Sequence, residues 1–294
     1  MILRTVKKFV IIALVVNCAL IGVLLFSRSA HPAAIHIFAV GQGDGIYIRT
    51  PEGYDIVIDG GPSPRAILSK LGRAMPFYDR TIDAVILSHP HADHVIGLIA
   101  LLLRYRVKQV YLSGAAHNTP EYRAFLELLR QHTEIQKIKV DHQFIVAFSP
   151  DTRLEFLYPT MDVAGTEALD FMGQNVNNTS VVVRFTHKQE SALFTGDIEK
   201  EAENYLVSRY ASAEENPETE TRLQAEILKV PHQGSKTSST IEFLQAVHPK
   251  IAVIPVGAKN RYGHPHKDTI DRLTEFGIKI LRTDYDGDIV LYLP

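Results

Sequence analysis

The residues best suited to chemistry form a short run, His89-Pro90-His91-Ala92-Asp93-His94, between an apolar segment and an expected helix. Neutral imidazoles and carboxylates are the ligands that borderline divalent metals accept. A tight strand-to-helix loop can aim side chains with this spacing at a common volume. The run therefore predicts a metal site with four ligands: His89, His91, Asp93 and His94.

Three more polar residues lie where an apolar strand is expected to end. Asp59 ends the segment 54–59, Asp197 comes shortly after 191–194, and His232 comes shortly after 225–230. In open sheets, sites gather at the carboxyl ends of strands. Alone, an Asp after Thr-Gly is more often a turn residue than a ligand, but the shared context predicts that all three converge with the histidine run.

Strand-like and helix-like segments alternate along the chain and predict an α/β protein. Strands are expected at 35–40, 46–50, 54–59, 84–88, 109–112, 135–140, 143–147, 153–158, 180–185, 191–194, 225–230 and 251–255, and a closing pair at 278–282 and 288–292. Helices are expected at 64–73, 92–104, 120–131, 198–210, 239–247 and 267–276. The acidic segment 211–222 is expected to be a solvated loop.

The composition excludes several classes of protein. Among 294 residues, 22% charged and 46% hydrophobic content rules out a disordered chain, a coiled coil, a collagen-like fibre and a polytopic membrane protein. Removing Arg4, Lys7 and Lys8 from the 31 basic residues leaves 28 against 33 acidic ones, so a polyanion must meet a local cationic feature such as metal ions. The single Cys18 excludes a disulfide framework and a Cys-based zinc site.

The amino terminus holds an uncharged apolar run at 9–26, preceded by Lys7 and Lys8. As a helix it would span about 27 Å, close to the thickness of a bilayer core. The flanking charges favour a single uncleaved transmembrane helix with the remainder outside the cytoplasm. A cleaved signal, which would give a secreted protein, and a buried soluble helix are the alternatives. The expected organisation is an anchor or signal segment with linker at 1–34 and one domain at 35–294.

The ordered motifs resemble a known family. HPHADH, with Asp59-Gly60-Gly61 before it and Thr195-Gly196-Asp197 after it, resembles the metallo-β-lactamase superfamily of binuclear metallohydrolases. Within it, GQGDG (41–45), NNTS (177–180), HQGS (232–235) and NRYGHP (260–265) resemble the hydrolase module of ComEC-type competence DNA-uptake proteins. The resemblance runs from about residue 35 to the carboxyl end.

The resemblance implies an αβ/βα four-layer sandwich that holds two divalent ions, Zn or Mn. It places His89 and His91 on the first ion, Asp93, His94 and His232 on the second, and Asp197 between them. Asp93 and His264 would be catalytic, Asp93 by accepting a proton and His264 by contacting the phosphate or protonating the leaving group. Residues beside the ligands or the substrate would be Asp59, which orients the cluster, Asp44, for which a structural turn is the alternative, and Asn178.

Two departures from the family pattern bear on activity. Asn177 and Asn178 stand where the superfamily brings a third His to the first ion, as in the competence subgroup, and Gln233 stands where that subgroup has a second His. The remaining histidines, His117 among them, are assigned no role.

The function expected from this resemblance is that of an exported, metal-dependent phosphodiesterase or nuclease that uses a metal-bound hydroxide, with DNA or another phosphodiester as substrate. One alternative is hydrolysis of an amide, a lactone or an envelope ester. Another is a catalytically weak binding protein at the cell envelope. We do not expect this chain alone to take up DNA, because it lacks a multi-helix channel.

Overall fold

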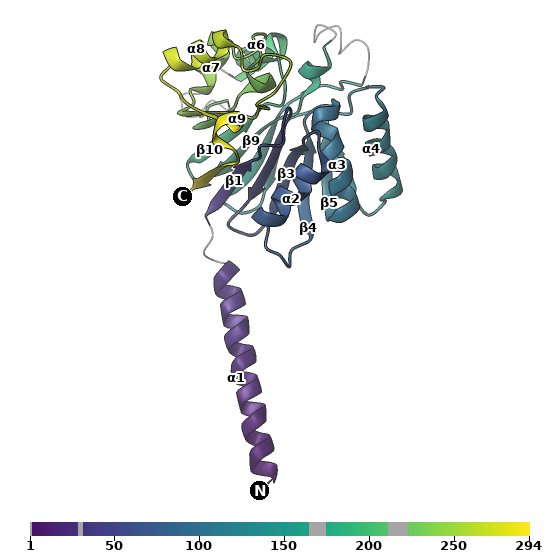
Figure 1. Ribbon diagram of the computed structural model, residues 1–294, viewed down its shortest axis with the longest axis vertical. Coiled ribbons are helices and arrows are strands. Elements are labelled where there is room, and N and C mark those ends of the chain that lie inside the picture. The colour runs from purple at the N-terminus through teal and green to yellow at the C-terminus, as the bar shows by residue number, and fades with distance from the viewer. Residues whose placement is uncertain (1, 29–31, 165–174, 211–222) are drawn as a thin grey trace.

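The computed structural model describes residues 2–28, 32–164, 175–210 and 223–294. In these residues, two seven-stranded sheets face each other, and helices cover the outer side of each (Figure 1). The predicted αβ/βα sandwich is thereby confirmed. Segment 211–222, expected to be a loop, lies outside the described residues.

The first sheet has the strand order β14-β1-β2-β3-β4-β5-β6. Its strands are β1 (Ala33–Ile37), β2 (Gly45–Arg49), β3 (Asp55–Gly60), β4 (Thr81–Leu87), β5 (Arg106–Leu112), β6 (Gln136–Lys139) and β14 (Ile289–Leu293). Helices α2 (Pro64–Ala74), α3 (Ala92–Arg104) and α4 (Pro120–Gln131) pack on its outer face. Strands β1 to β3 form an antiparallel meander, and β3 to β6 are parallel.

The second sheet has the order β13-β12-β11-β10-β9-β8-β7. Its strands are β7 (Phe144–Ala147), β8 (Thr152–Tyr158), β9 (Val182–His187), β10 (Glu190–Phe194), β11 (Ile227–Lys229), β12 (Ile251–Ile254) and β13 (Lys279–Arg282). Its outer helices are α6 (Lys200–Tyr210), α7 (Ile241–Val247) and α8 (Lys267–Glu275). Two 3-10 turns, η1 (Val176–Thr179) and η2 (Pro231–Gly234), lie next to strand ends.

Three apolar layers hold these elements together. Ile46, Ile58, Phe156 and Phe185 belong to the layer between the two sheets, which is buried throughout. The other two layers lie between each sheet and its helices. Burial of apolar surface contributes roughly 25 cal/mol per Å² to stability, so these layers fix the strand ends that carry the site.

The last two strands do not form the expected closing pair. β13 pairs in parallel with β12, whereas β14 pairs antiparallel with β1 in the other sheet, with Ala33 opposite Leu293. The short helix α9 (Thr283–Asp286) and Gly287, at φ 71°, separate them. The chain therefore changes sheets at a turn that strand patterning could not reveal.

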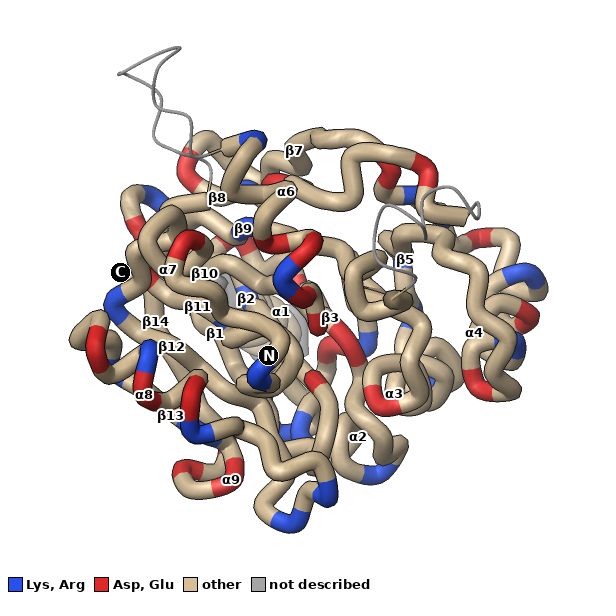
Figure 2. Tube along the Cα trace, turned by 90° about the horizontal axis from the view of Figure 1, so that it is seen from above, with Lys and Arg blue, Asp and Glu red and all other residues tan. Residues whose placement is uncertain are grey.

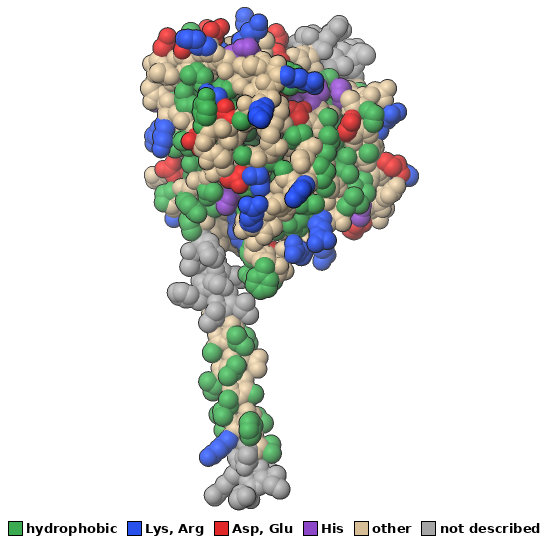
Figure 3. Space-filling model, viewed as in Figure 1, with side chains coloured by type: hydrophobic (Ala, Val, Ile, Leu, Met, Phe, Trp, Pro, Cys, Tyr) green, Lys and Arg blue, Asp and Glu red, His purple; other side chains and the backbone are tan. Residues whose placement is uncertain are grey.

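Helix α1 (Ile2–Arg28) stands away from the sandwich, and its apolar side chains are exposed where they are described (Figure 3). Among the described residues, no helix combines the length and apolar character needed to cross a membrane. The transmembrane helix predicted from 9–26 is therefore not supported. Localisation stays a prediction.

One close approach sets the position of the histidine run. The first turns of α3 lie against the end of β3, where a Cβ on Gly97 would come within 1.8 Å of the Gly60 carbonyl oxygen. The Gly97 N–H donates to the Gly61 carbonyl at 3.0 Å. Only glycine fits such backbone contact, and the contact brings Asp59 beside the residues that begin α3.

Candidate metal centre

Asp59 is buried next to the histidine run and contacts His94. It is fully buried; its Oδ1 accepts from the Ser88 N–H at 2.8 Å and its Oδ2 from the Ser88 hydroxyl at 2.6 Å. The same Oδ2 lies 2.7 Å from His94 Nδ1. This contact fixes the orientation of the His94 ring, and Nε2 of His94 faces the opposite side. The role of Asp59 in orienting a metal cluster stays a prediction.

His89 and His91 lie beside His94. His89 Nε2 is 3.0 Å from His91 Nδ1, and the rings of His89 and His94 have centroids 4.2 Å apart. Burial, followed by the neighbouring His94, lowers the pKa of His89 well below its usual value, and the pKa of His91 is lowered for the same reasons. Both imidazoles are therefore neutral at pH 7, the form that binds metal.

Asp197, just beyond β10, presents one oxygen to this group. Its Oδ2 lies 3.4 Å from His94 Nε2 and 3.9 Å from His232 Nε2. Asp93 Oδ2 is 3.8 Å from the same His94 nitrogen. The structure thus brings together all six predicted ligands, which come from three different loops. Their role as ligands stays a prediction.

His232 also has a carboxylate next to its ring, at ion-pair distance but, within the described residues, without the hydrogen-bond geometry that His94 Nδ1 has with Asp59. Its Nδ1 lies 3.1 Å from Glu199 Oε1, so a carboxylate sits behind the ring while Nε2 faces Asp197. Burial alone would raise the pKa of Glu199, but contacts with His232 and Asn177 lower it to about 2. Glu199 is therefore ionised, and it is a site residue that the sequence did not indicate.

The geometry fits a divalent ion. Within the described residues, His94 Nε2 is buried and has no hydrogen-bond partner, although it faces two carboxylates. Ligand atoms of His89, His94 and Asp197 lie within 4.8 Å of one another. Burial alone would lower the pKa of His94, but the surrounding carboxylates raise it well above its usual value. A cation is therefore favoured at this position, and a metal ion would take the place of that proton.

A buried lysine completes the charge balance. Lys229 Nζ lies 2.6 Å from Asp44 Oδ2, 3.2 Å from Asp197 Oδ1, and donates to the Gly196 carbonyl at 2.5 Å. Burial raises the pKa of Asp44 to about 7, against the opposing effect of Lys229. Lys229 therefore contacts Oδ1 of Asp197, whereas Oδ2 of Asp197 faces His94 and His232. Lys229 is also the charged partner of Asp44, whose contacts could not be predicted from the sequence.

Gln233 occupies the position between two of the carboxylates. Its Nε2 lies 3.4 Å from both Asp93 Oδ2 and Asp197 Oδ2, while Gln42 donates to its Oε1. Gln233 and His232 both have positive φ, 53° and 47°. The strained turn points His232 and Gln233 into the same site, and an amide fills the place where the subgroup has an imidazole.

The two asparagines differ in what they do. Asn178 Oδ1 accepts from the Glu199 N–H at 2.7 Å and its Nδ2 donates to Glu201 at 3.0 Å, so it shapes the turn that follows Asp197. Asn177 donates to Glu199 at 2.9 Å, and its buried Oδ1 has no partner in the described part of the chain. Asn177, rather than Asn178, lines the pocket above the ligands.

The pocket over the ligands has a volume of about 360 Å³. Asp93, Asp197 and Gln233 line it on one side, and His117, Tyr262 and His264 line it elsewhere. The His264 ring is 5.3 Å from that of His232, and burial together with His232 lowers its pKa to about 4. His117, which lies 5.3 Å from His91 by ring centroids, had no predicted role, although its place after β5 obeys the strand-end rule.

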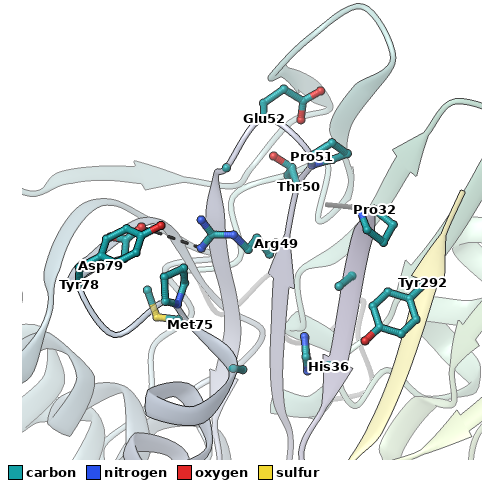
Figure 4. Close-up of a pocket in the computed structure, with 14 residues that line it drawn as sticks. Pro32, His36, Arg49, Thr50, Pro51, Glu52, Met75, Tyr78, Asp79 and Tyr292 are labelled. Carbon is teal, nitrogen blue, oxygen red and sulfur yellow. Dashed lines mark ion pairs between the residues drawn. The ribbon is translucent and has the colours of Figure 1, made fainter. Parts of the chain in front are cut away.

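A larger pocket of about 420 Å³ lies at the opposite ends of β3 and β4 (Figure 4). Its arginine, Arg49, is paired with Asp55 at 2.8 Å and lies 3.9 Å from Asp79. The two metal-ligand clusters found in the described residues lie elsewhere. We therefore place the chemistry in the smaller pocket.

Charges of both signs are mixed along the described part of the chain. In the view from above, the Cα trace shows Lys and Arg interspersed with Asp and Glu (Figure 2). An anionic substrate would then depend on cations bound within the site.

Comparisons with known proteins agree with this geometry. Residues 39–258 match the family described as the metallo-beta-lactamase superfamily. The chain is 28% identical over 274 residues to ComE operon protein 3 of Bacillus subtilis (strain 168), covering 87% of this chain and 32% of that protein. It is 29% identical over 255 residues to competence protein ComA of Neisseria gonorrhoeae, covering 87% and 31%. The chain therefore spans about a third of the length of these relatives.

Solved structures share the fold. CmlA, a diiron beta-hydroxylase from Streptomyces venezuelae, gives a TM-score of 0.56 at 14% identity, covering 90% of this chain and 55% of that one. A diphosphatase from the PhnP family gives 0.51 at 16% identity, covering 89% and 98%. At these identities the likeness concerns the fold alone.

Proposed function

The chain belongs to the metallo-β-lactamase superfamily, and from that premise we propose that it is a metal-dependent hydrolase of phosphodiesters. One observation carries the proposal: two histidines, each backed by a carboxylate, aim Nε2 at the same oxygen of Asp197. The competence proteins among its relatives support DNA strands as the substrate.

The proposed site holds two divalent ions, Zn or Mn. His89 and His91 would hold one ion, Asp93, His94 and His232 would hold the other, and Asp197 would serve both. Such ions, when bound, would polarise the scissile phosphate and lower the pKa of a water molecule. Their charge would also compensate the acidic floor of the pocket.

The chain's own residues would do the rest. Asp59 and Glu199 hold the two rings, and Lys229 keeps Asp197 oriented. Asp93, whose side chain is one-third exposed, lines the pocket and would accept a proton from water. His264 lines the same pocket and would contact a phosphate oxygen.

The test uses the full chain, stripped with chelator and reloaded with Mn²⁺ or Zn²⁺. We expect metal-dependent hydrolysis of bis-p-nitrophenyl phosphate that falls to background in Asp197→Asn and His94→Ala. His142→Ala, at an exposed histidine outside the pocket, is the matched control and should retain activity.

Two outcomes would overturn the proposal. Turnover of nitrocefin or a lactone with phosphodiesters untouched would assign a different bond. Full metal content with no turnover of any substrate would indicate a binding protein.

A further inference from the structure

The outer wall of the metal-site pocket is aromatic. Tyr262 lines it with 54% of its surface exposed, and its ring lies over that of His264 at a centroid distance of 5.9 Å and an interplanar angle of 30°. The Arg261 guanidinium carbon lies 5.5 Å from the centroid of the Tyr262 ring. Despite these two contacts, more than half of the Tyr262 surface stays open to solvent at the edge of the pocket.

The loop that carries Tyr262 is held in place by Asn260. Its Nδ2 donates to the carbonyls of Gly257 at 2.9 Å and His264 at 2.7 Å, and its Oδ1 accepts from the His264 N–H at 2.9 Å. Gly263, at φ 73°, turns the chain between them. Because these contacts hold the loop before any substrate arrives, stacking on the ring would cost little ordering entropy.

The other residues that line the pocket indicate which chemical groups of a substrate it can bind. None of the described residues lining the pocket is Lys or Arg, and Asp93 and Asp197 are acidic. The anionic group of a substrate would therefore face the bound ions. Besides uncharged polar side chains, the protein wall offers the remainder of the substrate ring surface, from Tyr262 on one loop and His117 on another.

We propose that Tyr262 is a stacking platform for a planar ring carried by one alcohol of the phosphodiester, with a nucleobase as the class of ring. The inference rests on the proposed function and names the substrate class of the same site. Stacking of a base on an aromatic side chain corresponds to about 5- to 100-fold in affinity. Every base has a π-face, so this platform would bind bases with little sequence preference.

The test compares two phosphomonoesters, which lack the phosphodiester bond that the site is proposed to cleave: thymidine 5′-phosphate and the abasic deoxyribose 5-phosphate. Dissociation constants are measured by calorimetry on the Mn²⁺-loaded full chain. We expect the thymidine compound to bind about 5- to 100-fold more tightly. Tyr262→Ala should abolish the difference, and Tyr262→Phe should keep it.

Tyr285→Ala is the matched control. Tyr285 is 77% exposed, has the Arg282 guanidinium carbon 4.2 Å from its ring centroid, and lies outside the pocket lining. Equal binding of the two ligands by the wild type, or a ratio that survives in Tyr262→Ala, would overturn the inference. The wild-type comparison decides even if the alanine variant does not fold. Base-dependent binding without hydrolysis of bis-p-nitrophenyl phosphate would instead count against the proposed function alone.

Discussion

Glu199 stands behind His232 at 3.1 Å as Asp59 stands behind His94 at 2.7 Å, although the two pairs come from different sheets of the sandwich. A carboxylate on one ring nitrogen fixes the tautomer of a histidine and raises the basicity of the other nitrogen. Each half of the fold therefore supplies one histidine whose Nε2 faces Asp197 Oδ2.

This relationship predicts the effect of Glu199→Gln. Loss of the carboxylate should weaken divalent metal affinity about 10- to 100-fold, the range found for partners that orient a metal-bound histidine. Competition with a fluorescent chelator measures it. Glu201→Gln is the control, because Glu201 accepts from Asn178 rather than from a histidine. Equal affinities in the two variants would show that Glu199 does not orient His232.

The contacts of Lys229 predict how two substitutions combine in their effect on the unfolding free energy, measured with chelator present. Lys229→Met leaves Asp44 and Asp197 buried without their cation, and breaking one partner of a buried ion pair costs about 3 to 5 kcal/mol. The double variant Lys229→Met with Asp44→Asn should recover part of that loss, because the uncompensated charge at Asp44 is gone. Urea unfolding measures both, and a double variant no more stable than the single one would contradict the pairing.

Gln233→His should increase metal retention. The amide of Gln233 sits 3.4 Å from Asp93 and Asp197, and an imidazole there would offer a ring nitrogen to the ion. Histidine tolerates the positive φ of 53° about as well as glutamine does. Metal content per chain after dialysis, measured by mass spectrometry, should rise above wild type. A fall would show that the amide itself contributes to binding.

The alternation of strands and helices predicted an α/β protein, and the resemblance to the metallo-β-lactamase superfamily implied the sandwich. The six candidate ligands could be named because a run of ligand-type residues after an apolar strand is visible without the fold; their role as ligands stays a prediction. Lys229 and Glu199 were missed because their partners are distant in the chain. A lysine within Glu226-Ile227-Leu228-Lys229-Val230 looks like a surface residue of a strand, and only the tertiary structure shows that it is buried against Asp44.

Asn178 illustrates the same limit at shorter range. The motif led us to predict Asn178, and not Asn177, as a residue beside the ligands or the substrate, but the contacts of the two side chains differ. Asn178 binds the Glu199 N–H and Glu201, whereas Asn177 lines the pocket. The pairing of β14 with β1 was unpredictable for a related reason, since it depends on the direction of a short turn.

His36, which lies outside the metal site, is expected to make the unfolding free energy depend on pH because it is partly buried. Burial in the pocket shown in Figure 4 lowers the pKa of His36 below 6.5, and Asp288 only partly opposes this. Below pH 6.5 the unfolded chain then binds a proton that the folded chain does not, so this residue makes stability fall as pH decreases. His36→Gln should flatten the slope of unfolding free energy between about pH 6.5 and 5, measured with urea in chelator. An unchanged slope would rule out this contribution.

Replacing either of two helix glycines by alanine should change the unfolding free energy in opposite directions, because Gly97 in α3 packs against β3 whereas a methyl group added at Gly72 in α2 would point into open space. In Gly97→Ala the new methyl group would meet the Gly60 carbonyl oxygen at 1.8 Å, so the helix must move away from the strand. We expect a loss of more than about 3 kcal/mol in unfolding free energy and weaker metal binding, because Asp93 and His94 move with the helix. Gly72→Ala in α2 meets nothing within 4 Å and should instead stabilise by about 0.5 to 1 kcal/mol. Thermal unfolding with and without metal separates the two effects, and a Gly97→Ala variant as stable as wild type would mean that α3 does not need this contact to place its ligands.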